Sequence, residues 1–203
     1  VFRGGEDLAG AFEALGGVPL ILESFVAFER EVSIIAARGI DGTIACYDPA
    51  DNVHRDGILH TSTLPARIEE ATADTARQAA EKLLAALDYV GVIGMEFFVM
   101  ADGSLIANEI APRVHNSGHW TIAGALTSQF AQCVRAVCGW PLGDSSRTGG
   151  LDVAMRNLIG DQADDWQTLL AEPGAHLHLY GKGDARPGRK MGHVTRLVRP
   201  RKS

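Results

Sequence analysis

Two apolar runs separated by a turn signal constrain the fold of this chain more than any other feature. Val92 to Met100 and Leu105 to Ile110 are rich in residues that favour strands, and Asp102-Gly103 between them is typical of a tight hairpin. With Asp102 and Gly103 at the tip, the expected cross-strand pairs are Met100 with Leu105, Phe98 with Ala107, and Glu96 with Glu109. The two glutamates then share one face of the hairpin.

This pair of opposed carboxylates predicts a metal site. Like charges directly opposite each other destabilise a strand pair, because their Cβ atoms lie only about 4.5–5.5 Å apart. A divalent cation would remove the repulsion, and Mg²⁺ fits best, since it takes one or two carboxylates and fills its other positions with water and phosphate oxygens. We therefore predict Glu96 and Glu109 as metal ligands. Two solvated glutamates on an exposed sheet face are the alternative.

The segment that follows the hairpin, Ala111 to Trp120, is too polar for a strand and too rich in turn formers for a helix. Arg113 offers a planar fork of donors for phosphate or carboxylate, and His115 can hold a proton near neutral pH. His115 and His119 have a spacing that binds zinc on a helix, but Asn116-Ser117-Gly118 disfavours a helix and no third soft ligand is nearby. The loop is predicted to bind an anionic substrate.

Asn108 to Thr121 resembles the signature of the N5-carboxyaminoimidazole ribonucleotide synthetase family, ATP-grasp enzymes of purine synthesis. The similarity continues through Glu31-Val32-Ser33, Ala37-Arg38-Gly39, His54 to Leu59, Tyr89 to Val92, and Arg186 to His193. It covers nearly the whole chain. The resemblance implies that ATP, with Mg²⁺, phosphorylates bicarbonate to carboxyphosphate, and that the amine of 5-aminoimidazole ribonucleotide is then carboxylated. It also implies a homodimer.

The same resemblance implies roles for individual residues. Arg113 would stabilise the carboxyphosphate anion, and His115 would orient bicarbonate or accept a proton during amine attack. The predicted ATP-binding residues are Glu23, Ser24, Phe25 and Val26 at the adenine, Glu31 at the ribose, and His54, Asn108 and Glu109. The predicted ribonucleotide-binding residues are Asn116 and Ser117, with Lys182 and Arg189 as the phosphate clamp. Taken alone, the cationic loop from Gly181 to Lys190 is more typical of a solvated hairpin tip, and its resemblance to the family's phosphate clamp reverses that interpretation.

Two other functions are compatible with the hairpin. The first is another ATP-grasp carboxylase or a formyl-phosphate-forming ligase, against which the loop from His115 to His119 argues. The second is a noncatalytic nucleotide-binding or assembly module, because the family's Gly-rich phosphate loop lies upstream of these residues. Since residue 1 is Val, we expect the chain to be the C-terminal portion of a longer protein.

Composition excludes several classes of protein. A chain of 203 residues with 46% hydrophobic content can bury a core, and its net charge of −6 gives no support for a nucleic-acid surface. Cys46, Cys133 and Cys138 have no metal-ligand spacing and fit a reducing compartment. No apolar run reaches the roughly 18 residues that span a bilayer, and no basic-then-apolar leader is present. We expect a cytoplasmic protein without a membrane partner.

Periodicity predicts an α+β chain. Glu6 to Leu15 reads as a helix and Val18 to Phe28 as a strand, and Glu31 to Ala37 should pair with Thr43 to Tyr47 across the Gly39-Gly42 turn. Pro65 to Leu87 is the clearest helix, with its buried stripe at Ile68, Thr72, Thr75, Ala79, Leu83 and Leu87. A second helix is expected from Thr121 to Val137, with its buried stripe at Ile122, Leu126, Phe130 and Val134.

A polar stretch after Pro141 predicts a boundary between two domains. Residues 1–143 would form the second half of an ATP-grasp domain, an antiparallel sheet with flanking helices. Residues 144–203 would form a small β-rich domain, which the resemblance implies is cut short at its end. Its expected strands are Val153 to Leu158, His176 to Tyr180 and Met191 to Val198, with a short helix around Asp165 to Leu170.

Overall fold

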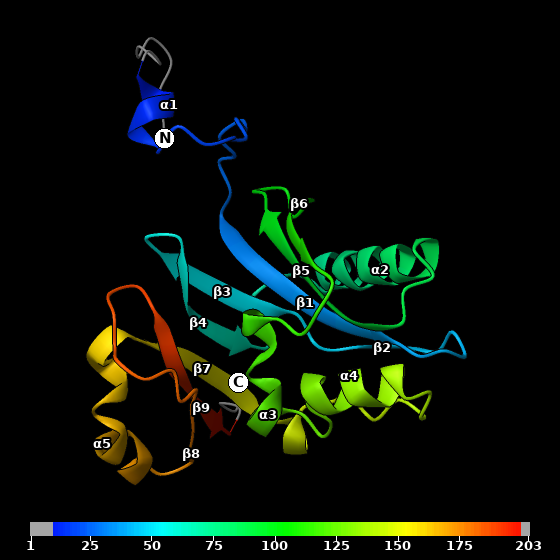
Figure 1. Ribbon diagram of the computed structural model, residues 1–203. Helices are drawn as coiled ribbons and strands as arrows, with labels where there is room; N and C mark the ends of the chain where they lie inside the picture. The colour runs from blue at the N-terminus through cyan, green and yellow to red at the C-terminus, as the bar shows by residue number, and fades with distance from the viewer. Residues whose placement is uncertain (1–9, 200–203) are drawn as a thin grey trace.

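The computed structural model of this chain describes residues 10–199. These residues form one nine-stranded antiparallel sheet in the order β6-β5-β1-β3-β4-β7-β9-β8, with β2 paired to the far end of β1 (Figure 1). The strands are β1 Arg30–Arg38, β2 Ile44–Cys46, β3 Ala50–Arg55, β4 Ile58–Leu64, β5 Gly91–Val99, β6 Leu105–Ala111, β7 Asp152–Ile159, β8 Ala175–Leu179 and β9 Lys190–Val198. The predicted α+β architecture is confirmed.

Helices cover the sheet on both faces (Figure 1). They are α1 Ala11–Ala14, α2 Glu70–Ala86, α3 Thr121–Gly124, α4 Gln129–Val137 and α5 Trp166–Ala171, with 3₁₀ turns η1 Asn116–Gly118, η2 Thr148–Gly150 and η3 Gly160–Ala163. Alternating residues of the central strand β1 enter two different cores. Ile34 packs beneath α2 with Ala80 and Leu84, whereas Ile35 packs on the opposite face with Trp120. The middle of β1 is therefore buried from both sides.

Helix α2 begins later and presents a different face than its sequence predicts. It starts at Glu70 rather than Pro65, and Thr75, which was expected in the buried stripe, is exposed. The buried residues are Thr72, Ala73, Ala76, Ala80 and Leu84. The alanine side of the helix faces the sheet, because small side chains allow the helix backbone to approach the strands closely. A search for apolar periodicity alone does not predict this choice of face.

The expected single helix from Thr121 to Val137 is two helices. Ala125 has an extended backbone, and the Ser128 hydroxyl accepts a hydrogen bond from Ala131 N at 3.2 Å, so that α4 starts with its own N-cap. The predicted buried stripe is wrong, because Ile122, Leu126, Phe130 and Val134 are 38–59% exposed. The buried side chains of α4 are instead Gln129, Gln132 and Ala136.

The N-terminal part also differs from its prediction. Val18 to Phe28 is not a strand, since no strand within residues 10–199 pairs with it, and most of its side chains are exposed. A strand pattern needs a partner for its backbone groups. Of the helix expected from Glu6 to Leu15, α1 is the observed part, and residues 6–9 lie outside the described residues.

The other predicted elements are confirmed. β1 and β2 form the expected antiparallel pair, and the C-terminal strands and short helix lie within two residues of their predicted bounds. The sheet continues across the boundary expected at residues 143 and 144, because β4 pairs with β7 from Thr61↔Arg156 to Leu64↔Val153. The division into two domains stays a prediction.

Candidate active site

The hairpin of β5 and β6 brings Glu96 and Glu109 opposite each other, as predicted. Its tip has three residues rather than two, because Met100 N donates to Ser104 O and Gly103, with φ +79°, closes the turn. The predicted pairs Met100 with Leu105 and Phe98 with Ala107 are therefore wrong by one residue. A β-bulge between Glu96 and Phe97 restores the pairing at the glutamates.

His115 lies between the two carboxylates. Its Nδ1 is 3.6 Å from Glu96 Oε1, and its Nε2 is 3.7 Å from Glu109 Oε1. Burial lowers the pKa of His115, which the charge of Glu109 only partly opposes, so the ring is neutral near pH 7. A neutral imidazole held between two carboxylates has a free lone pair and can accept a proton.

The two glutamates have different environments. Glu96 is 6% exposed, and burial raises its pKa, whereas the side chain of Glu109 is 53% exposed. The nearby charges of Glu109 and Glu31 raise the pKa of Glu96 further, while His54 and Lys190 oppose them. Anionic groups thus converge on one place of the sheet, where a cation would be favoured.

Lys190 is a member of this site that sequence reasoning did not select. It begins β9, and burial lowers its pKa, although the charges of Glu96 and Glu109 act in the opposite direction. The sequence places Lys190 at the end of the cationic loop, directly before the strand predicted from Met191, and that loop was predicted either as a phosphate clamp or as a solvated hairpin tip. The structure instead brings Lys190 near enough to Glu96 and Glu109 for their charges to raise its pKa.

The loop from Ala111 to Trp120 is held in place by Gln129 of α4. The Gln129 side chain accepts from His115 N at 2.9 Å and donates to His115 O at 2.7 Å, so both backbone groups of His115 are satisfied by one residue. Ser117 Oγ lies 2.8 Å from His115 Nδ1 and orients the ring. Gly94 lies beneath it, where a Cβ would be 2.6 Å from His115 Cβ. The position of the imidazole is therefore fixed on three sides.

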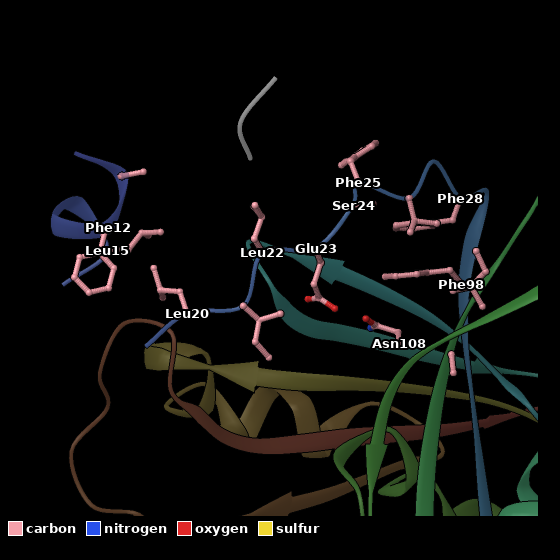
Figure 2. A pocket seen from close by; sticks show the side chains of 15 residues that line it. Phe12, Leu15, Leu20, Leu22, Glu23, Ser24, Phe25, Phe28, Phe98 and Asn108 are labelled. Atoms are coloured by element: carbon pink, nitrogen blue, oxygen red, sulfur yellow. The ribbon is translucent and has the colours of Figure 1, made fainter. Parts of the chain in front are cut away.

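Five of the residues predicted to bind ATP line one cavity of about 700 Å³. Glu23, Ser24, Phe25 and Val26 lie on one wall and Asn108 on the hairpin wall, and the Glu23 carboxylate points toward Asn108 (Figure 2). Phe28 stacks on Phe98 with ring centroids 4.4 Å apart at the edge of the cavity. Apolar walls with a few polar groups are typical of a site for a flat heterocycle.

Two other predicted nucleotide-binding residues meet on neighbouring strands. The carboxylate of Glu31 on β1 contacts Nδ1 of His54 on β3. Glu31 also opposes Phe98 of β5, and Ser33, two residues later, opposes Glu96. Since residues two apart share a face, Glu31 lies on the same side of the sheet as Phe98 of the cavity wall and Glu96.

The predicted ribonucleotide-binding residues come from two segments. Asn116 and Ser117 form the 3₁₀ turn η1 beside His115, and Asn116 Nδ2 is buried without a hydrogen-bond partner among the described residues. Lys182 and Arg189 lie on the loop between β8 and β9, where Lys182 Nζ donates to Lys190 O at 3.0 Å. Arg113 is exposed, and its guanidinium donates to Val114 O. The roles of these residues stay predictions.

Family comparison agrees with this geometry. Residues 1–130 match the model of the ATP-grasp domain, which is more than half of the chain. The chain belongs to the ATP-grasp family. Within this ATP-grasp chain, residues 153–202 match the Phosphoribosylaminoimidazole carboxylase C-terminal domain.

Several relatives of this ATP-grasp chain are named N5-carboxyaminoimidazole ribonucleotide synthase. The N5-carboxyaminoimidazole ribonucleotide synthase of Brucella melitensis is 61% identical over 191 residues, which are 94% of this chain and 52% of that protein. The synthetase structure from Thermus thermophilus has a TM-score of 0.87 and 48% identity, covering 98% of this chain and 54% of that one. The Aspergillus clavatus synthase, in complex with ADP and 5-aminoimidazole ribonucleotide, has a TM-score of 0.87 and 36% identity, covering 94% and 52%.

The chain spans about half the length of the curated relatives it matches. Among residues 10–199, no helix is long and apolar enough to cross a membrane.

Proposed function

We propose that the protein carrying this chain uses ATP and bicarbonate to carboxylate 5-aminoimidazole ribonucleotide, giving N5-carboxyaminoimidazole ribonucleotide through carboxyphosphate. The observation that carries the proposal is the neutral His115 ring between Glu96 and Glu109, of which Glu109 directly follows Asn108 of the cavity wall. The names of the relatives and the ligands of the Aspergillus structure support the same reaction. A cytoplasmic homodimer is part of this proposal by resemblance only.

ATP would place its adenine in the cavity of Glu23 to Val26 and its ribose near Glu31 and His54. Its phosphates would then lie over the hairpin, toward Asn108 and Glu109. Phe98 of the cavity wall, Glu31 and Glu96 all lie on one face of the sheet, and this arrangement supports that direction of the nucleotide. The nucleotide would thus bring its terminal phosphate to the place where the carboxylates converge.

Glu96 and Glu109 would hold Mg²⁺. Within the described residues, no group of three or more acidic, histidine or cysteine side chains is arranged to hold a metal ion alone. Two carboxylates suit Mg²⁺ when phosphate oxygens and water supply the other ligands. When bound, the ion would neutralise charge on the transferring phosphoryl group.

The remaining residues would act on bicarbonate and the amine. Arg113 would stabilise the carboxyphosphate anion, and the neutral His115 would orient bicarbonate or accept the proton released when the amine attacks. Asn116 and Ser117 would contact the ribonucleotide, whose phosphate would bind Lys182 and Arg189. The buried Asn116 amide, which has no partner among residues 10–199, supports such a contact, because a buried donor without a partner is costly.

The direct test measures ADP release by the natural protein with ATP and Mg²⁺. We expect release to require bicarbonate, to rise when 5-aminoimidazole ribonucleotide is added, and to accompany incorporation of labelled bicarbonate into that ribonucleotide. ADP release that needs a different acceptor would indicate another ATP-grasp ligase. Nucleotide binding without turnover would indicate a noncatalytic module.

Arg189→Ala tests the phosphate clamp. Loss of a charge-assisted contact costs about 1.5–3 kcal/mol, so the KM for 5-aminoimidazole ribonucleotide should rise by about 10-fold or more, while the KM for ATP stays within about twofold. Arg186→Ala is the matched control, since it removes an equal charge from an exposed position of the same loop. Equal effects of Arg189→Ala on both substrates would contradict a dedicated clamp.

A further inference from the structure

The hydroxyl of Tyr180 joins two parts of the chain that are far apart in sequence. Tyr180 Oη lies 2.8 Å from Nδ1 of His119 and 3.0 Å from Nδ1 of His193. His119 ends the loop that carries His115, and His193 belongs to β9. The three rings also pack together, with centroids 5.2–5.8 Å apart.

The bridge requires a particular tautomer of each histidine. A phenol hydroxyl has one proton, so it donates to one imidazole nitrogen and accepts from the other. Burial lowers the pKa of His119 to about 4 and that of His193 to about 3, and it raises the pKa of Tyr180, so all three groups are neutral near pH 7. One histidine must then carry its proton on Nδ1 and the other on Nε2.

The ring of Tyr180 has a second contact. The Lys182 ammonium lies 5.0 Å from the centre of the ring, a cation–π distance, while it donates to Lys190 O. Tyr180 N also donates to Met191 O, which closes the base of the loop from Gly181 to Lys190. One residue therefore contacts the His119 loop through its hydroxyl and the lysine of the cationic loop through its ring.

We propose that Tyr180 is a positioning residue, which sets the place of the Lys182 ammonium relative to the loop of His115 and His119 through its bridge to His119 and His193. The inference rests on the proposed function, since the group that Lys182 would bind is the phosphate of 5-aminoimidazole ribonucleotide. The hydroxyl and the ring have separable roles, and substitution of each can be measured.

Tyr180→Phe in the natural protein keeps the ring and removes the bridge. We expect the KM for 5-aminoimidazole ribonucleotide to rise about tenfold, because the bridge that fixes the Lys182 ammonium relative to the His119 loop is lost, with the KM for ATP within about twofold. Tyr180→Leu, which also removes the contact with Lys182, should raise the same KM further. An unchanged KM for the ribonucleotide in Tyr180→Phe, or an equal rise for ATP, would overturn the proposal.

Tyr47→Phe is the matched control. Tyr47 is 1% exposed, and its hydroxyl donates to Thr127 O at 2.8 Å, so this variant also loses one buried hydrogen bond. It should lower stability and leave both KM values unchanged. If Tyr47→Phe raised the ribonucleotide KM as much as Tyr180→Phe, the effect would be one of general destabilisation, and the proposal would be wrong.

A measurement on the unsubstituted protein covers the case in which Tyr180→Phe does not fold. Nitrogen-15 NMR of labelled histidine at pH 7 should show His119 and His193 as opposite neutral tautomers. The same tautomer in both would exclude the bridge even if the enzyme is active, and would leave the proposed function intact. Absence of carboxylation by the unsubstituted protein would instead remove the proposed function and, with it, the positioning role.

Discussion

Replacement of Glu109 by glutamine is expected to lower bicarbonate-dependent ADP production by about 100-fold or more. The substitution keeps the shape of the side chain and removes one of two carboxylates that would hold Mg²⁺, whose charge stabilisation is worth several kcal/mol in the transition state. ADP release at saturating Mg²⁺ would measure this loss. Near-normal release under those conditions would contradict the assignment of Glu109 as a ligand.

The same variant should remain folded. The Glu109 side chain is 53% exposed and opposes another carboxylate, so glutamine should change the free energy of unfolding by no more than about 0.5 kcal/mol. Glu69→Gln is a suitable control, because Glu69 is an exposed glutamate that precedes α2 on a different part of the surface. A loss of activity in both variants would point to a general effect of charge.

Gln129→Ala is expected to lower the free energy of unfolding by about 2–5 kcal/mol and to lower turnover with it. The side chain is fully buried and satisfies both backbone groups of His115, each of which would cost about 1–3 kcal/mol if left without a partner. Urea denaturation measures the stability, and steady-state ADP release under folding conditions measures the activity.

Gln132→Ala is a matched control for Gln129→Ala. It lies one turn further along α4, is equally buried, and holds Gly143 N and Gly143 O at 2.7 Å in the same way. Gln132→Ala should therefore cost similar stability but leave turnover of the folded protein unchanged, because Gly143 does not contact the candidate site. Equal losses of turnover in both variants would show that Gln129 has no special relation to His115.

Local chemistry explains which parts of the site could be predicted. The pairing of Glu96 with Glu109 follows from two strand patterns and a turn signal within about twenty residues, and no long-range information is needed. The three-residue tip escaped prediction because Asp102-Gly103 fits more than one type of turn. The β-bulge between Glu96 and Phe97, in which Asn108 is the extra residue on β6, compensated for that difference. The predicted pairing of Glu96 with Glu109 was therefore right, although the neighbouring pairs were wrong.

The residues that sequence reasoning missed depend on packing between segments that are far apart in the sequence. On α4, apolar periodicity selected the exposed face with Phe130 and Val134, because buried glutamines that bind loop backbone have no signature in a single sequence. Lys190 was missed for a similar reason: its charge comes near those of Glu96 and Glu109 only in the assembled sheet. Val18 to Phe28 shows the opposite error, in which a strand pattern was present without a partner strand.

The ladder between β4 and β7 limits how this molecule can move. It joins the strands that carry Glu31 and Glu96 to the strand β9 that begins with Lys190, through continuous backbone hydrogen bonds. A hinge between these parts would have to break that ladder, so they should act as one rigid body during turnover. Within the described residues, larger movements are then left to segments outside the sheet, such as residues 18–28 and the loop from Gly181 to Arg189.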